Sequence, residues 1–521
     1  MKATYRPLTD EHYARLLYRR QFVLGPRAAP RAPGWRTTPV PTGGPRDLVL
    51  ATHSDLGVAR VDQDGVHVTL VGYALDPDHP ERTDADLARE VARTAGHPGE
   101  AVRLTARWGG RWALIVTRDG AGVAFTDAAG MRQIFHAATA EGPWLASQPE
   151  ALASALGLEV SARGRAFLAS GYVAREPEWF WPNGSSPYDG VRRLLPNHWL
   201  TLPDARVERF WPREAIAPLP FDQAVTRGAA LLRGTVAAAV RRFPLAVPIT
   251  AGFDSRGLLA ASREWAAQIY YYTMRYDRYG AGHYDLRIAR RLARHLGIHH
   301  RVIRCPAVAE PHFAKLYAAS VHPAPAEPGA IADGLFADYP DDRVCVVGHA
   351  AEIARCGDYF RMEYYPREPI TAERVAHYTR MWDTPYAAEE YAPWLAGARE
   401  VERATGVRIL DLMHWEQWVG NWAADGEAQW DIVMERLPAY VNRELLTTLL
   451  AVDVARREKP EFELTRALIG RLWPDALGVP INPAPLELKE LVRGALRLAR
   501  LEAPVLSLYH RLKGDAPGPH A

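Results

Sequence analysis

Hydrophobic and polar positions follow two different patterns along this chain. From about residue 47 to residue 146, short runs alternate apolar and polar residues, as at 66–71 (VHVTLV) and 112–116 (WALIV), with turn residues between them. Apolar residues at helical spacing interrupt these runs over 84–95. The first half is therefore predicted to be α+β, with a helix packed on strands.

From residue 221 onward the pattern changes to alternating helices and strands. It predicts, in order, a helix at 221–242, a short apolar strand at 245–250, a helix at 255–264, a strand at 269–274, a helix at 284–296 and a strand at 300–303. Such alternation favours a doubly wound parallel sheet, hence an α/β fold. Helical spacing and many tryptophans between about 364 and 471 predict a helical cap on that sheet.

Passages rich in proline and tryptophan separate the two patterns, the last of them at 210–212 (FWP). They place a domain boundary between about 212 and 220. We therefore predict an N-terminal domain at 1–215, an α/β domain at 216–495, and a C-terminal helix and tail at 496–521.

Composition narrows the classes of function. The 521 residues carry 63 Lys and Arg against 61 Asp and Glu, which gives no broad basic surface for nucleic acid or a membrane. The cysteines, Cys305, Cys345 and Cys356, form no CxxC pair, and no signal peptide or long apolar run stands out. We expect a cytoplasmic protein that binds neither nucleic acid nor membrane, with a homodimer left open.

The loop at 250–256 (TAGFDSR) is the strongest candidate for chemistry. It joins a predicted strand to a predicted helix, and its small residues let backbone N–H groups approach a ligand at a helix N-terminus that favours negative charge. Phosphate is the natural ligand of such a loop. The alternative is an ordinary turn in which Asp254 or Ser255 caps the helix. The residues alone leave both interpretations open.

The same loop resembles the Ser-Gly-Gly-x-Asp-Ser loop of N-type ATP pyrophosphatases. The segments 282–287 (GHYDLR) and 295–300 (HLGIHH) are similar to the corresponding unit of the asparagine synthetase B family, and 108–114 (WGGRWAL) and 127–135 (DAAGMRQIF) resemble its glutaminase-type N-terminal domain. The resemblance spans nearly the whole chain. It implies a PP-loop ATP-pyrophosphatase domain behind an N-terminal domain of glutaminase (Ntn) type.

One departure from the family concerns its nucleophile. Family glutaminases use a cysteine at the mature N-terminus, whereas Lys2 follows Met1 here. Without a thiolate the amide of glutamine has no attacking group, so the N-terminal domain is predicted to be a scaffold. This places the chain nearer to β-lactam synthetases and lasso peptide cyclases, in which an amine of the substrate attacks.

The resemblance implies an ATP-dependent, AMP-forming amide-bond ligase of a natural-product or other specialised pathway. Its cofactors would be ATP and Mg²⁺, and its partners a small-molecule or peptide carboxylate and an amine. The alternative is an inactive homologue that acts as a binding or regulatory partner.

The resemblance also implies site residues. Those for nucleotide binding are Thr250, Ala251, Gly252, Asp254, Ser255, Arg256, Met274 and Gly348. Asp254 and Glu352 would hold Mg²⁺, since a hard cation needs carboxylate oxygens.

Three residues are predicted to act in catalysis. His349 stands where β-lactam synthetases carry the tyrosine of their base dyad, and it is predicted to be a general base, with an ordinary loop histidine as the alternative. Glu416 would lie near the acceptor, unless it lies on a solvated helix face. Lys489 is the nearest substitute for the family's transition-state lysine, with Arg355 and Arg256 as other cations and a solvated helix lysine as the alternative.

The aromatic residues at 179–181 and at 415, 418 and 422 are predicted to be packing residues.

Overall fold

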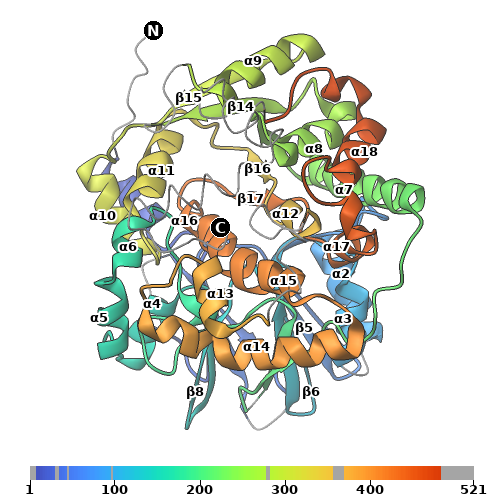
Figure 1. Ribbon diagram of the computed structural model, residues 1–521. Helices are drawn as coiled ribbons and strands as arrows, with labels where there is room; N and C mark the ends of the chain where they lie inside the picture. Colours follow the sequence, from blue (N-terminus) through green and yellow to red (C-terminus); the bar gives the residue numbers. More distant parts are fainter. Residues whose placement is uncertain are drawn as a thin grey trace, which may run out of the picture.

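The computed structural model describes residues 8–29, 34–43, 46–94, 98–202, 204–276, 282–355 and 369–482. It is a mixed α/β structure with two antiparallel sheets and one parallel sheet (Figure 1). In the view of Figure 1 the parallel sheet lies above the antiparallel strands, with α7, α8 and α18 on one side and α10 and α11 on the other. Lys489 and the predicted C-terminal tail at 496–521 lie outside the described residues.

The first half of the chain forms two six-stranded antiparallel sheets. Their strand orders are β10-β8-β9-β1-β3-β2 and β12-β11-β7-β6-β5-β4. The strands are β1 (Phe22–Gly25), β2 (Arg36–Val40), β3 (Leu48–Thr52), β4 (Val58–Gln63), β5 (Val66–Leu75), β6 (Gly109–Arg118), β7 (Ala121–Thr126), β8 (Phe135–Thr139), β9 (Gly142–Ala146), β10 (Arg192–Arg193), β11 (His198–Leu202) and β12 (Val207–Arg209).

These two sheets pack face to face between helices. Alternate residues of each strand point inward, so that Leu24 and Leu50 of the first sheet meet Ile115 of the second. The outer face of the second sheet is covered by α2 (Asp84–Thr94) and α3 (Pro98–Thr105), and that of the first sheet by α4 (Pro149–Leu156). The result is the α+β organisation that the alternating pattern predicts, in four layers.

The second half is built on a five-stranded parallel sheet in the order β15-β14-β13-β16-β17. Its strands are β13 (Leu245–Pro248), β14 (Tyr270–Arg275), β15 (His300–Arg304), β16 (Val344–Val347) and β17 (Arg436–Pro438). The chain adds β14 and β15 on one side of β13 and then returns to place β16 on the other side. Ligands of open α/β sheets bind beyond the carboxyl ends of the strands at such a reversal of strand order.

Helices cover both faces of the parallel sheet. One face packs against α7 (Phe221–Arg242), α8 (Phe253–Ala261), α9 (Tyr284–Leu296), α17 (Arg443–Leu450) and α18 (Glu463–Leu472). The other face packs against α11 (Ala326–Asp338). The helices α7 and α9 have the bounds that the sequence predicts, because their apolar faces and end residues are well defined.

The remaining elements are mostly helical. They are α1 (Asp10–Leu16), α5 (Ala162–Leu168), α6 (Gly171–Arg175), α10 (Pro311–Ser320), α12 (Ala351–Ala354), α13 (Ala372–Tyr378), α14 (Pro385–Thr405), α15 (Ile409–Leu412), α16 (Ala424–Gln429), the π-helix η4 (Met413–Ala423), and the 3₁₀ turns η1 (Pro182–Gly184), η2 (Arg263–Trp265), η5 (Val454–Arg456) and η6 (Pro474–Leu477). Within the described ranges, no helix combines the length and apolar character needed to cross a membrane.

A buried cluster of charged side chains joins the two halves. Arg111 of β6 donates to both oxygens of Asp431, at 2.5 and 2.8 Å, and Arg132 donates to Glu435 at 2.9 Å. Both arginine side chains are only 1% exposed. The cluster therefore fixes the segment after α16 against the N-terminal sheets.

Replacing Arg111 by methionine is expected to lower the free energy of unfolding by about 3–5 kcal/mol, because the buried Asp431 carboxylate then loses its main partner. Urea denaturation of the two proteins measures this difference. Glu264→Gln is the matched control, since Glu264 pairs with Arg233 at a half-exposed site and such pairs contribute about 1 kcal/mol or less. Equal losses in the two variants would contradict the assigned role of the cluster.

Candidate active site

The loop between β13 and α8 is held by its own side chains. The Oγ of Ser255 accepts a hydrogen bond from the Thr250 N–H at 3.1 Å and lies 2.8 Å from the Thr250 Oγ1, which accepts from the Gly252 N–H at 3.1 Å. The Ala251 N–H donates to the Asp285 carboxylate of α9 at 2.7 Å. These contacts fix the predicted phosphate loop in one conformation at the N-terminus of α8.

Arg256 follows this loop but does not face a ligand. Its guanidinium is fully buried and donates to the backbone carbonyls of Ala476, Val479 and Pro480, at 2.7, 2.9 and 3.2 Å. Burial lowers the pKa of Arg256 to about 10. Arg256, predicted to contact the nucleotide, does not line the cavity described below, and its donors tie α8 to the segment after α18.

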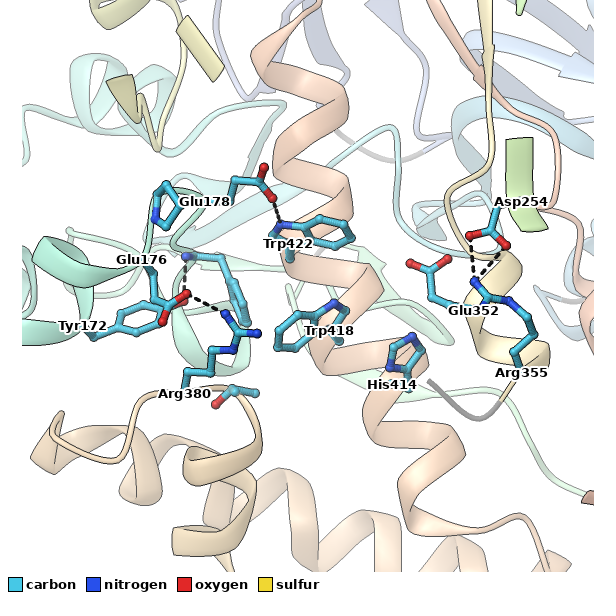
Figure 2. Close-up of a pocket in the computed structure, with 13 residues that line it drawn as sticks. Tyr172, Glu176, Glu178, Asp254, Glu352, Arg355, Arg380, His414, Trp418 and Trp422 are labelled. Carbon is cyan, nitrogen blue, oxygen red and sulfur yellow. Dashed lines mark hydrogen bonds and ion pairs between the residues drawn. The ribbon is translucent and has the colours of Figure 1, made fainter. Parts of the chain in front are cut away.

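Asp254 and Glu352 lie just beyond the carboxyl ends of β13 and β16, the two neighbouring strands at which the strand order reverses. Asp254 is in the first turn of α8, after β13, and Glu352 is in α12, after β16. Both line one cavity of about 320 Å³ (Figure 2). Burial and the negative charge of Asp254 raise the pKa of Glu352 above its ordinary value. Two carboxylates that the sequence separates by about a hundred residues are thus brought to one site.

Gly348 makes this approach of the two elements sterically feasible. A Cβ atom at position 348 would stand 2.7 Å from the Cβ of Asp254, which is closer than real side chains come. The end of β16 therefore passes directly against the first turn of α8. Gly348, predicted as a nucleotide-binding residue, is therefore placed beside Asp254 of the loop.

Arg355, at the end of α12, shares this cavity. Its Nη2 donates to both oxygens of Asp254, at 2.8 and 2.7 Å. Figure 2 shows Asp254, Glu352 and Arg355 together on one side of the cavity. A cation therefore already lies on one of the two predicted metal ligands.

The two carboxylates suit Mg²⁺, which takes one or two carboxylates and completes its shell with water and phosphate oxygens. Across the residues that the structure describes, no group of three or more His, Cys, Asp or Glu side chains is arranged to hold a metal ion. No side chain of the described ranges donates a hydrogen bond to the Glu352 carboxylate. The donor set thus fits a metal shared with phosphate and not a closed metal site.

His349 pairs with a carboxylate that the sequence did not single out. Its Nδ1 lies 2.5 Å from Oε1 of Glu427, a fully buried residue of α16. Burial opposes ionisation of Glu427, but the charge of Arg436 and the hydrogen bond from His349 outweigh it and lower the pKa of Glu427 to about 2. An ionised Glu427 accepts the Nδ1 proton, which leaves Nε2 as the basic nitrogen of the ring.

A second, smaller cavity lies beside His349. It measures about 120 Å³ and is also lined by Met274, at the end of β14, and by Trp422. Glu178 and Trp422 line both cavities, and the Trp422 indole donates to Glu178 at 2.9 Å. The predicted residues Met274 and His349 therefore line one cavity, which shares Glu178 and Trp422 with the cavity of Asp254 and Glu352.

Glu416, predicted to lie near the acceptor or else on a solvated helix face, is buried, so the solvated alternative is wrong. Its fully buried carboxylate accepts from Arg209 at 2.8 Å, from the Trp394 indole at 2.8 Å and from Asn197 at 3.0 Å. It lines neither of the two cavities. The π-helix η4 directs it toward β12 and α14, so the acidic partner of the site is Glu427.

The tryptophans of η4 divide between packing and the cavity. Trp415 is fully buried and its indole donates to the Ala128 carbonyl, as expected of a packing residue. Trp418, Trp422 and Phe180 line the larger cavity, which the sequence did not predict (Figure 2). The spacing of Trp418 and Trp422 along η4 carried no signal, because packing tryptophans recur at the same intervals.

A histidine behind the loop stays neutral. The Nε2 of His300 lies 2.7 Å from the Thr273 Oγ1, which donates to the Ile249 carbonyl at 2.6 Å. Burial and the positive charge of Arg290 lower the pKa of His300 to about 4 from its ordinary value of 6.5. His300 therefore supports the start of the loop as an uncharged group.

This shift predicts a pH dependence of stability. Between pH 6.5 and about 4 the unfolded chain binds a proton at His300 and the folded chain does not, so stability falls as the pH falls through this range. His300→Gln can keep an N–H donor toward the Thr273 Oγ1 but cannot titrate. We expect wild type to lose more unfolding free energy than the variant between pH 7 and pH 4.5 in urea denaturation. Equal losses would place the titration elsewhere.

Comparisons with known proteins add little to this geometry. No family model matches the chain, and no curated protein matches it. A solved structure described as the allosteric regulatory enzyme of purine biosynthesis is 10% identical, with a TM-score of 0.25 over 60% of this chain and 75% of that one. Glutamine phosphoribosylpyrophosphate amidotransferase from B. subtilis, complexed with ADP and GMP, is 10% identical, with a TM-score of 0.24 over 59% and 88%. At these TM-scores neither likeness supports an inference about this chain.

Proposed function

We propose that this protein is an ATP-dependent, AMP-forming amide ligase with an ATP-pyrophosphatase-type C-terminal domain. The observation that carries the proposal is the placement of Asp254 and Glu352. They follow the two strands that flank the reversal of strand order, they line one cavity, and the small-residue loop lies at the start of the same helix as Asp254. A carboxylate pair beside a phosphate-binding loop is what a metal–nucleotide complex requires.

The proposed reaction has two steps. An oxygen of the substrate carboxylate bonds to the α-phosphorus of ATP, and the bond from that phosphorus to pyrophosphate breaks. An amine then bonds to the acyl carbon and AMP leaves. Bound Mg²⁺ would supply positive charge against the phosphates, held by Asp254 and Glu352. His349, oriented by Glu427, would take the proton that the attacking amine loses, at Nε2.

The amine is proposed to come from the substrate and not from glutamine. The cysteines of the described ranges, Cys305 and Cys345, both lie in the second half of the chain. Burial raises the pKa of Cys305 to about 12 and that of Cys345 to about 11, so neither thiol is a ready nucleophile. The N-terminal half is proposed to be a glutaminase-like scaffold without that activity.

The larger cavity is proposed to receive the organic substrate. Figure 2 shows Trp418 and Trp422 between Asp254 and Glu352 on one side and Glu176 and Arg380 on the other. Phe180 also lines this cavity. Besides the aromatic residues the cavity is lined by charged side chains, among them Glu176, Glu178 and Arg380, so it suits a polar organic molecule. A small molecule or the end of a peptide fits a cavity of about 320 Å³.

The test is the identity of the nucleotide product. Purified protein is incubated with Mg·ATP and a panel of carboxylates and amines, and AMP, ADP and pyrophosphate are separated by chromatography. Equimolar AMP and pyrophosphate, with exchange of labelled pyrophosphate into ATP in the presence of the carboxylate alone, are expected. ADP as the product would reject the mechanism.

A second candidate is an inactive homologue that serves as a binding partner. The observation that favours it is the contact of Arg355 with Asp254, which places a cation of the chain on a predicted metal ligand. Binding of Mg·ATP without any pyrophosphate exchange across the carboxylate panel would support this candidate over the ligase.

A further inference from the structure

Arg355, the cation that contacts Asp254, differs from the other cations near the proposed nucleotide site in its position. Arg256 is committed to three backbone carbonyls. Arg380, which lines the far side of the larger cavity, pairs with Glu176 at 3.0 Å. Arg355 lies directly beside the two predicted metal ligands, with its side chain 10% exposed. Among the cations of the described ranges that line this cavity, Arg355 is the one next to the carboxylate pair.

The contact between Arg355 and Asp254 competes with a metal ion. One nitrogen of the guanidinium donates to both carboxylate oxygens, which are the atoms that a metal would take. The remaining carboxylate, Glu352, lies close enough for the charge of Asp254 to affect it. In the free protein, therefore, one carboxylate of the pair, Asp254, is held by a positive charge of the chain itself.

A phosphate group is a better partner for an arginine side chain than a single carboxylate is. Its planar group matches two phosphate oxygens at once, and it keeps its charge throughout. Arg355 also ends a helix of four residues, α12, so its side chain is anchored close to the site. Arg355 can exchange the Asp254 carboxylate for a phosphate group by a change of its side-chain rotamer.

We propose that Arg355 is an exchangeable cation that holds Asp254 in the free protein and binds the pyrophosphate group when the metal–nucleotide complex enters. This inference rests on the proposed function and deepens it. During adenylation the α-phosphorus bonds to the substrate carboxylate, and its bond to the bridging oxygen breaks with the electron pair on pyrophosphate. Arg355 neutralises the charge that pyrophosphate gains, and no proton is transferred.

Two binding measurements on unreacted protein test the exchange. Binding of Mn²⁺ alone is followed by electron paramagnetic resonance, and binding of pyrophosphate or of AMP in the presence of Mg²⁺ by calorimetry. Arg355→Gln is expected to bind Mn²⁺ about tenfold more tightly than wild type, because the competing cation is gone, and to bind pyrophosphate about 10–100-fold more weakly. AMP affinity should be unchanged, and Arg355→Lys should lie between the two proteins.

The two shifts have opposite signs, which a merely structural role of Arg355 would not produce, since a damaged site binds both probes more weakly. Weaker Mn²⁺ binding in Arg355→Gln, or unchanged pyrophosphate affinity in both variants, overturns the proposal. Wild-type protein that binds no pyrophosphate with Mg²⁺ also overturns it. Opposite shifts without AMP formation on any carboxylate would keep the exchange and reject the ligase, so the two failures are distinguishable.

Discussion

Replacing Asp254 by asparagine is expected to reduce the formation of AMP and pyrophosphate from ATP by about 10³-fold or more, the scale of losing a group that acts on transferring phosphoryl charge. Asparagine keeps the size of the side chain, so the close contact with Gly348 is preserved. It removes the anion that, with Glu352, is proposed to hold Mg²⁺. It also removes the charged partner of Arg355. Chromatography of the nucleotide products measures the effect.

The control for this variant is Glu264→Gln, in η2 just after the same helix. Glu264 is half exposed and pairs with Arg233, away from the cavity, so product formation should match that of wild type. Thermal unfolding of the Asp254 variant should stay near that of wild type, since the Asp254 side chain is 31% exposed. Near-normal AMP formation by Asp254→Asn would reject the proposed metal site.

Replacing His349 by alanine is expected to separate the two half-reactions. Exchange of pyrophosphate into ATP should continue, because His349 lines the smaller cavity and not the one that contains Asp254 and Glu352. Formation of the amide should fall by about 10²–10⁴-fold, the usual effect of removing a general base. The two rates are measured on one protein preparation, by label exchange and by product formation.

Glu427→Gln should separate the two rates in the same way for a different reason, with some loss of stability because the buried Arg436 also loses its carboxylate partner. Glutamine fills the space of Glu427 but lacks the charge that stabilises the protonated imidazole of His349. The contrasting variant is Glu416→Gln, which weakens the buried contacts to Arg209 and Trp394 and should lower stability and both rates together. Unchanged amide formation in His349→Ala would remove the base from the mechanism.

The elements between 221 and 304 could be read from the sequence with little error, but β17 of the parallel sheet lies within the stretch 364–471 that was predicted to be a helical cap. The helices at 221–242 and 284–296 were predicted at their observed bounds, since their apolar residues recur at helical spacing over many residues. Strand 245–250 was predicted longer than the observed β13, which ends at Pro248. The chain leaves the sheet there because the next residues turn into the loop that precedes α8.

The sequence likewise indicated some residues of the candidate site and missed another. The sequence pointed to Asp254, Ser255, Glu352 and His349, because short motifs record residues that lie close together along the chain. It missed Glu427, which stands 78 residues after its partner His349, and it chose Glu416 instead. Nothing in the local pattern distinguishes these two acidic residues of neighbouring helical segments. Their burial and partners do, through Arg209 in one case and His349 in the other.

What the sequence determined by itself is therefore the alternating elements between 221 and 304 and the loop that starts α8, since hydrophobic periodicity and small residues act over short distances. The tertiary structure decided which side chains share a cavity. It placed Arg256 on backbone carbonyls, Arg355 on Asp254, and Glu427 under His349. These assignments depend on strand order and on the reversal between β13 and β16, which bring residues far apart in the chain to the same edge of the sheet.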